Sequence, residues 1–217
     1  GANLIYWNRG GWKLERSRLC DYPAPFVNGV SLADFNGDGQ MDLIVMLPGL
    51  PPGFYEGSPG GKFEDKPRKI VAGLPSDGSS YATAVGDPDG DGDLDVWVTQ
   101  YKQPYVNGQF PTPYFDANDG FPSYLLVNDG RGNFTNGTEA AGLASKQRRR
   151  TYSASFVDID ADGDQDLVIV NDFAGMDLYL NDGRGKFTDV TAQLGADRHS
   201  FGMSHALADF NGDGRID

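Results

Sequence analysis

A nine-residue acidic segment occurs four times in the chain, and this repetition constrains the fold more than any other feature. The copies, named here the first to fourth Asp loops, are DFNGDGQMD at 34–42, DPDGDGDLD at 87–95, DIDADGDQD at 158–166 and DFNGDGRID at 209–217. Their starting positions are 53, 71 and 51 residues apart. Repetition at such intervals predicts an architecture built from similar units, each too small to bury its own apolar surface.

Each unit has the pattern of four short β-strands. Apolar residues precede the Asp loop, as at 30–33 and 154–157, and β-branched residues follow it, as in LVIVN at 167–171. Two further strands are then joined by a turn rich in Asn, Asp and Gly, the residues that hairpins use where φ is positive. This second motif is clear at 124–136 and 178–191 and degenerate at 4–16 and 53–65.

Four antiparallel strands per unit predict an all-β fold, a β-propeller with one blade in each unit. A sandwich of stacked hairpins is the alternative. Because both terminal units are incomplete, we expect a segment of a larger propeller rather than a small closed ring. The predicted units are a half-blade at 1–25, blades at 26–75, 76–147 and 148–200, and the start of a further blade at 201–217.

The Asp loop has the composition of a cation site. Positions 1, 3, 5 and 9 are always Asp or Asn, position 6 is always Gly, and position 7 varies, as expected if it contributes only its backbone carbonyl. The predicted metal-binding residues are Asp34, Asn36, Asp38, Gln40, Asp42, Asp87, Asp89, Asp91, Asp93, Asp95, Asp158, Asp160, Asp162, Asp164, Asp166, Asp209, Asn211, Asp213, Arg215 and Asp217.

Calcium is the ion that this composition favours. Oxygen ligands without His or Cys indicate a hard cation, and many ligands on a flexible, glycine-rich loop favour Ca²⁺ over Mg²⁺. Two carboxylates about 4 Å apart repel by about 4 kcal/mol at an effective dielectric of 20, so a divalent ion would relieve the crowding. The loop is not an EF-hand, because position 12 is Val45, Val98 or Ile169 instead of Glu. We expect up to four Ca²⁺ ions; a metal-free Asp/Gly turn is the alternative.

The overall composition narrows the class of partner. The net charge of −13 argues against nucleic acid as a partner, and the four Asp loops hold 16 of the 31 acidic residues. No apolar run approaches the length of a membrane span, and the first residues do not resemble a signal peptide. Cys20 is the only cysteine, so neither a disulfide framework nor a cysteine-rich zinc site is expected.

These motifs resemble a known family. FGMSHALADFNGDGRID at 201–217 is similar to the FG-GAP repeat of integrin α-subunit propellers. The pairing of DADGDQDLVIVNDF with LYLNDGRGKFTDVT is closer to the VCBS/FG-GAP repeats of cartilage acidic protein-like (ASPIC/UnbV-type) proteins. The resemblance implies a propeller, usually seven-bladed, with Ca²⁺ between the first two strands of a blade, in an extracellular, cell-surface or periplasmic protein. The GAP triplet itself is absent after each loop.

Two further segments bear on partners. Residues 101–122, an insertion rich in Tyr, Phe and Pro, suit contact with a sugar or peptide or, alternatively, packing on a neighbouring blade. The basic run KQRRR at 146–150 either docks an acidic partner or offsets nearby Asp charge.

The predicted function is a calcium-binding scaffold for binding or adhesion, with a protein or carbohydrate ligand. The alternative is the propeller domain of a secreted carbohydrate-active lyase or hydrolase. No catalytic cluster favours that alternative, since His199 and His205 lack an accompanying nucleophile or metal motif.

Overall fold

The computed structural model describes residues 4–19, 27–63, 67–70, 74 and 78–217. Parts of the predicted units 1–25, 26–75 and 76–147, together with Cys20, lie outside the described residues. No helix in the described part of the chain has the length and apolar character needed to cross a membrane.

The described chain is built from β-strands and three short 3₁₀ helices. The strands are β1 (Leu4–Asn8), β2 (Leu14–Arg18), β3 (Gly29–Ala33), β4 (Asp42–Met46), β5 (Gly53–Tyr55), β6 (Gly57–Ser58), β7 (Lys62–Phe63), β8 (Arg68–Lys69), β9 (Ser80–Gly86), β10 (Asp95–Gln100), β11 (Tyr124–Val127), β12 (Thr135–Asn136), β13 (Arg150–Val157), β14 (Asp166–Asp172), β15 (Gly175–Asn181) and β16 (Phe187–Asp189). The helices are η1 (Val106–Gly108), η2 (Ala144–Lys146) and η3 (Thr191–Arg198).

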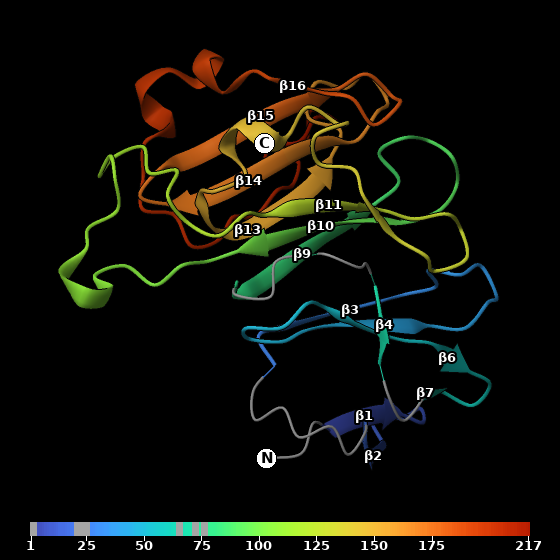
Figure 1. Ribbon diagram of the computed structural model, residues 1–217. Helices are drawn as coiled ribbons and strands as arrows, with labels where there is room; N and C mark the ends of the chain where they lie inside the picture. The colour runs from blue at the N-terminus through green and yellow to red at the C-terminus, as the bar shows by residue number, and fades with distance from the viewer. Residues whose placement is uncertain (1–3, 20–26, 64–66, 71–73, 75–77) are drawn as a thin grey trace.

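Three sheets have four antiparallel strands each. Their strand orders are β3-β4-β5-β8, β9-β10-β11-β12 and β13-β14-β15-β16. The second and third sheets use consecutive strands, whereas the β6-β7 hairpin lies between β5 and β8 in the first. Two-stranded sheets are formed by β1-β2 and by β6-β7. Figure 1 shows the sheets in succession from β1 and β2 up to β13–β16.

Both faces of the middle sheet are buried because the side chains of β10 alternate between two cores. Val96 and Val98 belong to the core shared with β3–β5, whereas Trp97 belongs to the core shared with β13–β16. Strand β4 alternates in the same way, with Ile44 in the first core and Val45 in a third core near β7. The unbroken apolar sequences after the Asp loops are therefore explained by sheets that stack face to face.

The first strands of neighbouring sheets lie side by side. Strand β9 contacts both β3 and β13. The hydroxyl groups of Ser31 in β3 and Thr83 in β9 are hydrogen bonded, and the rings of Tyr81 in β9 and Tyr152 in β13 lie 5.7 Å apart edge to face. The same series continues beyond β13, where Nε2 of His205 lies 2.8 Å from Oγ of Ser155.

The prediction for residues 53–65 was wrong in detail. The strand at 62–63 was expected to complete the first blade, but β7 pairs with β6 in a separate hairpin. The partner of β5 is β8 instead. Gly57 explains the break after β5: its N–H donates to Oδ1 of Asp42 at 2.8 Å, and a Cβ there would lie 2.1 Å from the carbonyl oxygen of Met41.

The predicted fold class is confirmed at the level of an all-β chain of antiparallel sheets. The arrangement is consistent with a segment of a β-propeller, and the sheets do not close into a ring. The unit boundaries and the seven-bladed ring stay predictions.

Candidate metal centre

The four Asp loops share one hydrogen-bond pattern. The position 1 carboxylate accepts the backbone N–H groups of positions 5 and 6 at 2.7–3.2 Å. The position 3 side chain accepts the N–H of position 5 at 2.9–3.4 Å, and the position 5 carboxylate accepts the N–H of position 7 at 2.7–3.1 Å. The acidic side chains therefore turn inward over a tight coil of backbone in every copy.

Two positions of each loop have left-handed backbone. At position 6, φ lies between 82° and 99°, and the invariant glycine avoids a clash with its own Cβ. At position 4, φ lies between 66° and 79°, which the sequence analysis did not anticipate because one copy has alanine there. Three loops have glycine at position 4, and the third loop has Ala161.

The fold brings carboxylates together in the second and third loops. One oxygen each of Asp87, Asp89 and Asp91 lies within 4.8 Å of the others. Asp158 and Asp160 form an equivalent group with Asp166. Oxygen groups of this kind fit a hard cation such as Ca²⁺. The first and fourth loops have asparagine at position 3, Asn36 and Asn211, and so offer fewer carboxylates.

The position 9 aspartates are buried where β4, β10 and β14 begin. Asp42, Asp95 and Asp166 are at most 1% exposed. In each, Oδ1 accepts a backbone N–H at 2.8 Å from a residue that follows the third strand of its sheet or ends it. Burial raises the pKa of Asp42 and Asp166, although these N–H groups act against the shift. The carboxylates of Asp42, Asp95 and Asp166 thus join their loops to the third strands of their sheets.

The second loop leaves two buried carboxylate oxygens, Oδ1 of Asp93 and Oδ2 of Asp95, without a hydrogen bond among the described residues. In the other loops the N–H of position 2 donates to Oδ2 of position 9 at 2.9–3.0 Å. Position 2 of the second loop is Pro88, which has no N–H, and Oδ2 of Asp95 has no partner among the described residues. Burial raises the pKa of Asp95 to about 7 and, together with repulsion from Asp91 and Asp89, that of Asp93 to about 6. A cation beside these carboxylates would supply the missing partner and compensate their charge.

Two of the variable residues at position 7, Asp93 and Asp164, lie against the Gly-containing turns. Oδ2 of Asp93 would lie 3.2 Å from a Cβ on Gly130, and Oδ2 of Asp164 would lie 2.5 Å from a Cβ on Gly183. Metal binding by position 7 carbonyls, including those of Gln40 and Arg215, stays a prediction.

The Asn-Asp-Gly turns link each Asp loop to the neighbouring blade. The side-chain amide of Asn181 donates to the carbonyl oxygen of Gln165 in its own loop at 3.0 Å and to that of Pro88 in the preceding loop at 2.6 Å. Asn128 makes the equivalent bonds to Leu94 and Phe35 at 3.2 and 2.7 Å. The sequence analysis treated these asparagines only as turn residues, although their repetition at the same place in two units was the available signal.

The comparisons with known proteins support part of the predicted resemblance. Residues 158–217 match the family model described as FG-GAP-like repeat. The matched region begins directly after β13 and contains the third and fourth Asp loops and strands β14, β15 and β16. A search of curated proteins finds no match. The similarity to FG-GAP repeats is thus supported, whereas the closer similarity to integrin α-subunits or cartilage acidic protein-like proteins stays a prediction.

Proposed function

We propose that the Asp loops bind Ca²⁺ and that the bound ions stabilise a scaffold for protein or carbohydrate recognition. The observation that supports calcium binding most directly is the grouping of carboxylates in the second and third loops, next to the unpaired buried oxygen of Asp95. The carboxylates of Asp87, Asp89, Asp91, Asp158, Asp160 and Asp166 would hold the ions there.

The role of calcium in this proposal is structural. Each loop lies between the first two strands of a blade and is joined to the third strand through position 9. The Asn128 and Asn181 amides extend this connection to the next blade. An ion within a loop would therefore stiffen both the blade that contains it and the contact between blades.

The scaffold role is supported by the repeat type and by the exposed loops. FG-GAP repeats are typical of propeller domains that act in binding and adhesion, and residues 158–217 match such a repeat. The insertion 101–122 presents Tyr105, Phe110 and Phe115, which are 50%, 64% and 67% exposed. We propose an extracellular, cell-surface or periplasmic setting, where free calcium is abundant enough to fill such loops.

Chelation tests the calcium proposal. Saturation at about 100 times Kd stabilises a folded protein by about 2.7 kcal/mol per site, which corresponds to about 5–10 °C in Tm for a chain of this size. We expect EDTA to lower Tm by at least that amount and titration calorimetry to show saturable Ca²⁺ binding. Asp158→Asn should weaken binding, whereas Glu139→Gln, an exposed change outside the loops, should not. An identical melt with calcium and with EDTA would contradict the proposal.

A ligand screen tests the scaffold role separately. We expect the calcium-loaded protein to retain a glycan or a protein ligand on an array without converting it. Release of a cleaved product would instead favour the carbohydrate-active enzyme.

A further inference from the structure

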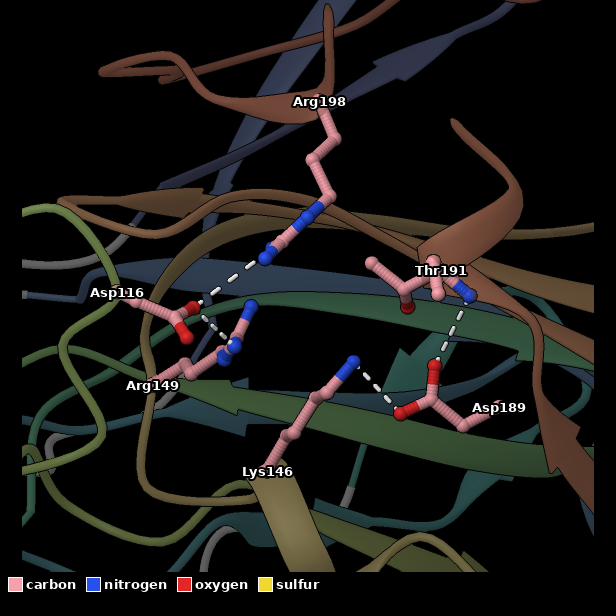
Figure 2. A pocket seen from close by; sticks show the side chains of 7 residues that line it. Asp116, Lys146, Arg149, Asp189, Thr191 and Arg198 are labelled. Atoms are coloured by element: carbon pink, nitrogen blue, oxygen red, sulfur yellow. Dashed lines mark hydrogen bonds and ion pairs between the residues drawn. The ribbon is translucent and has the colours of Figure 1, made fainter. Parts of the chain in front are cut away.

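A polar pocket lies at the end of the β13–β16 sheet opposite the third Asp loop. It has a volume of about 210 Å³ and is lined by Asp116, Lys146, Arg149, Asp189, Thr191, Ala192 and Arg198. Figure 2 shows the charged groups of Lys146, Arg149, Arg198, Asp116 and Asp189 directed toward a common space. A liquid water molecule occupies about 30 Å³, so the cavity has room for one small ligand residue.

Two of the three cations in the pocket are held by buried or partly buried carboxylates. Nζ of Lys146 lies 2.6 Å from Asp189 and 3.1 Å from Asp177. Nη1 of Arg149 lies 2.7 Å from the same Oδ1 of Asp177, and its Nη2 lies 2.5 Å from Oδ1 of Asp116. Although burial would raise the pKa of Asp189, hydrogen bonds from Lys146 and Thr191 lower it below the ordinary value, so this carboxylate is ionised.

Arg198 is the cation with unused hydrogen-bonding capacity. Its Nη1 lies 3.7 Å from Oδ1 of Asp116, the atom that Arg149 already binds, and it has no hydrogen bond within the described structure. The side chain of Arg149 is 5% exposed, and its buried Nε also lacks a partner there. Unpaired guanidinium donors beside a cavity suit an anionic ligand group such as a carboxylate.

The pocket also offers acceptors, and these distinguish between carboxylate ligands. Asp116 is 45% exposed in its side chain, and its Oδ1 is the oxygen that faces both Arg149 and Arg198. Its other oxygen can accept a hydroxyl group. A ligand that satisfies both Arg198 and Asp116 therefore carries hydroxyl donors next to its carboxylate. A sugar acid has this combination on one ring, whereas the side chain of an acidic amino acid does not.

Exposed aromatic rings adjoin one lining residue of the pocket, Asp116, along the chain. Phe115 precedes Asp116 in the chain, and its ring centroid lies 5.1 Å from that of Tyr114 and 6.4 Å from that of Phe201. Phe115 and Phe201 are 67% and 53% exposed. Flat apolar surfaces of this kind suit the carbon-bound hydrogen face of a sugar ring.

We propose that this pocket binds the carboxylate of an acidic sugar residue through Arg198 and Arg149, with Asp116 accepting its hydroxyl groups. The inference rests on the proposed scaffold function and names its ligand class. It does not depend on the Asp loops, none of which contributes a residue to the pocket lining.

Binding of free glucuronate and galacturonate, followed by calorimetry and ligand-observed NMR, tests the proposal. We expect both uronates to bind the calcium-loaded protein and glucose and galactose to bind much more weakly. Arg198→Gln should weaken uronate binding about tenfold or more, because a hydrogen bond to a charged group contributes about 1.5–3 kcal/mol. Arg131→Gln, which changes an exposed arginine away from the pocket, should leave binding unchanged.

Further arms make the outcome decisive. Asp116→Asn keeps the shape of the side chain and should also weaken uronate binding, which covers the case in which Arg198→Gln does not fold. The proposal is overturned if glutamate or phosphate binds as tightly as the uronates, if the neutral sugars do, or if both pocket variants bind like the wild type. Calcium-dependent melting of the same samples reports separately on the Asp loops, so failure there is distinguishable from failure of the pocket.

Discussion

At the scale of single residues, the Asp loop is constrained by backbone conformation as much as by carboxylate chemistry. Ala161 has φ of 66° at a position where the other three loops have glycine. A residue with a Cβ loses about 1–2 kcal/mol of stability when its backbone is left-handed. Glycine avoids this strain, but it loses more conformational entropy on folding. The third loop therefore contains a residue that is less favourable than its counterparts.

Replacing this alanine tests the conformational argument. Ala161→Gly should raise the free energy of unfolding by about 1 kcal/mol, because the strain is removed without changing a carboxylate. Gly163→Ala, at φ of 99° in the same loop, should lower it by about 1 kcal/mol or more. Urea denaturation measures both. A destabilised Ala161→Gly variant would show that the alanine methyl group contributes packing that outweighs the strain.

The carboxyl of Asp95 predicts a pH dependence in the calcium-free protein. Burial raises its pKa to about 7, whereas the unfolded chain has an ordinary aspartate value near 3.9. Between these values the unfolded chain has released the proton that the folded chain keeps, so raising the pH favours unfolding. In EDTA, stability should therefore fall between about pH 4 and pH 7, as measured by urea unfolding. Calcium affinity should rise over the same range because the ion competes with this proton.

The matched variant for this prediction is Asp95→Asn, which cannot titrate. Its calcium-free stability should fall less with rising pH than that of the wild type, because the raised pKa of Asp93 remains. His205 acts in the opposite direction, since burial lowers its pKa and stability from that source rises with pH. Equal pH profiles for the wild type and Asp95→Asn would contradict the assignment to Asp95.

At the scale of elements, the basic run 146–150 fastens the aromatic insertion to the β13–β16 sheet. Arg150 is 2% exposed and binds both carboxylate oxygens of Asp119 at 3.0 and 3.1 Å. The N–H of Gly120 donates to the carbonyl oxygen of Arg148 at 2.6 Å. Of the two interpretations of the basic run, the contacts of Arg150 favour the one in which it offsets nearby Asp charge.

Removing the Arg150–Asp119 ion pair should lower the local stability of the insertion more than that of the sheet. Arg150→Ala removes the bidentate pair and should speed amide hydrogen exchange within residues 101–122 by about tenfold, which corresponds to about 1.4 kcal/mol of local stability. Exchange in β14 and β15 should change much less. Arg131→Ala removes an exposed arginine outside this network and serves as the control. Equal exchange rates in both variants would show that the insertion is held by its other contacts.

At the scale of the whole molecule, the sheets are coupled by stacked apolar faces and by one asparagine per interface near the Asp loops. Asn128 links the first and second Asp loops, and Asn181 links the second and third. Asn181 is 8% exposed, so the carbonyl oxygens that it binds are shielded from water that could replace it. Neighbouring blades therefore share hydrogen bonds and are expected to unfold together.

Asn181→Ala tests this coupling. It leaves the carbonyl groups of Pro88 and Gln165 without their donor and should lower the free energy of unfolding by about 2 kcal/mol. The urea transition should also broaden, because one interface is weakened relative to the blades that it joins. Gln193→Ala removes an exposed carboxamide from η3 and should have little effect. An unbroadened transition with unchanged stability would contradict the coupling.

The strand pattern and the Asp loops could be predicted from the sequence because both depend on local rules. A strand whose side chains contact two cores in alternation must be apolar throughout, as residues 43–47 are. The Asp loop needs glycine at position 6 because the backbone there is left-handed in every copy. The first blade shows the limit of such rules. Whether β7 or β8 pairs with β5 depends on contacts of Gly57 with Asp42 and Met41, which lie some fifteen residues away.

The sequence by itself determined the repeat, the all-β class and the acidic loops, since each depends on residues close together in the chain. Only the tertiary structure decided which groups from different units meet. It placed Asn181 against Pro88, left Asp95 with an unpaired oxygen, and assembled Asp116, Arg149 and Arg198 around one pocket. Such contacts depend on the relative position of neighbouring sheets. That position results from the packing of whole sheet faces against each other, and a local pattern of residues does not specify it.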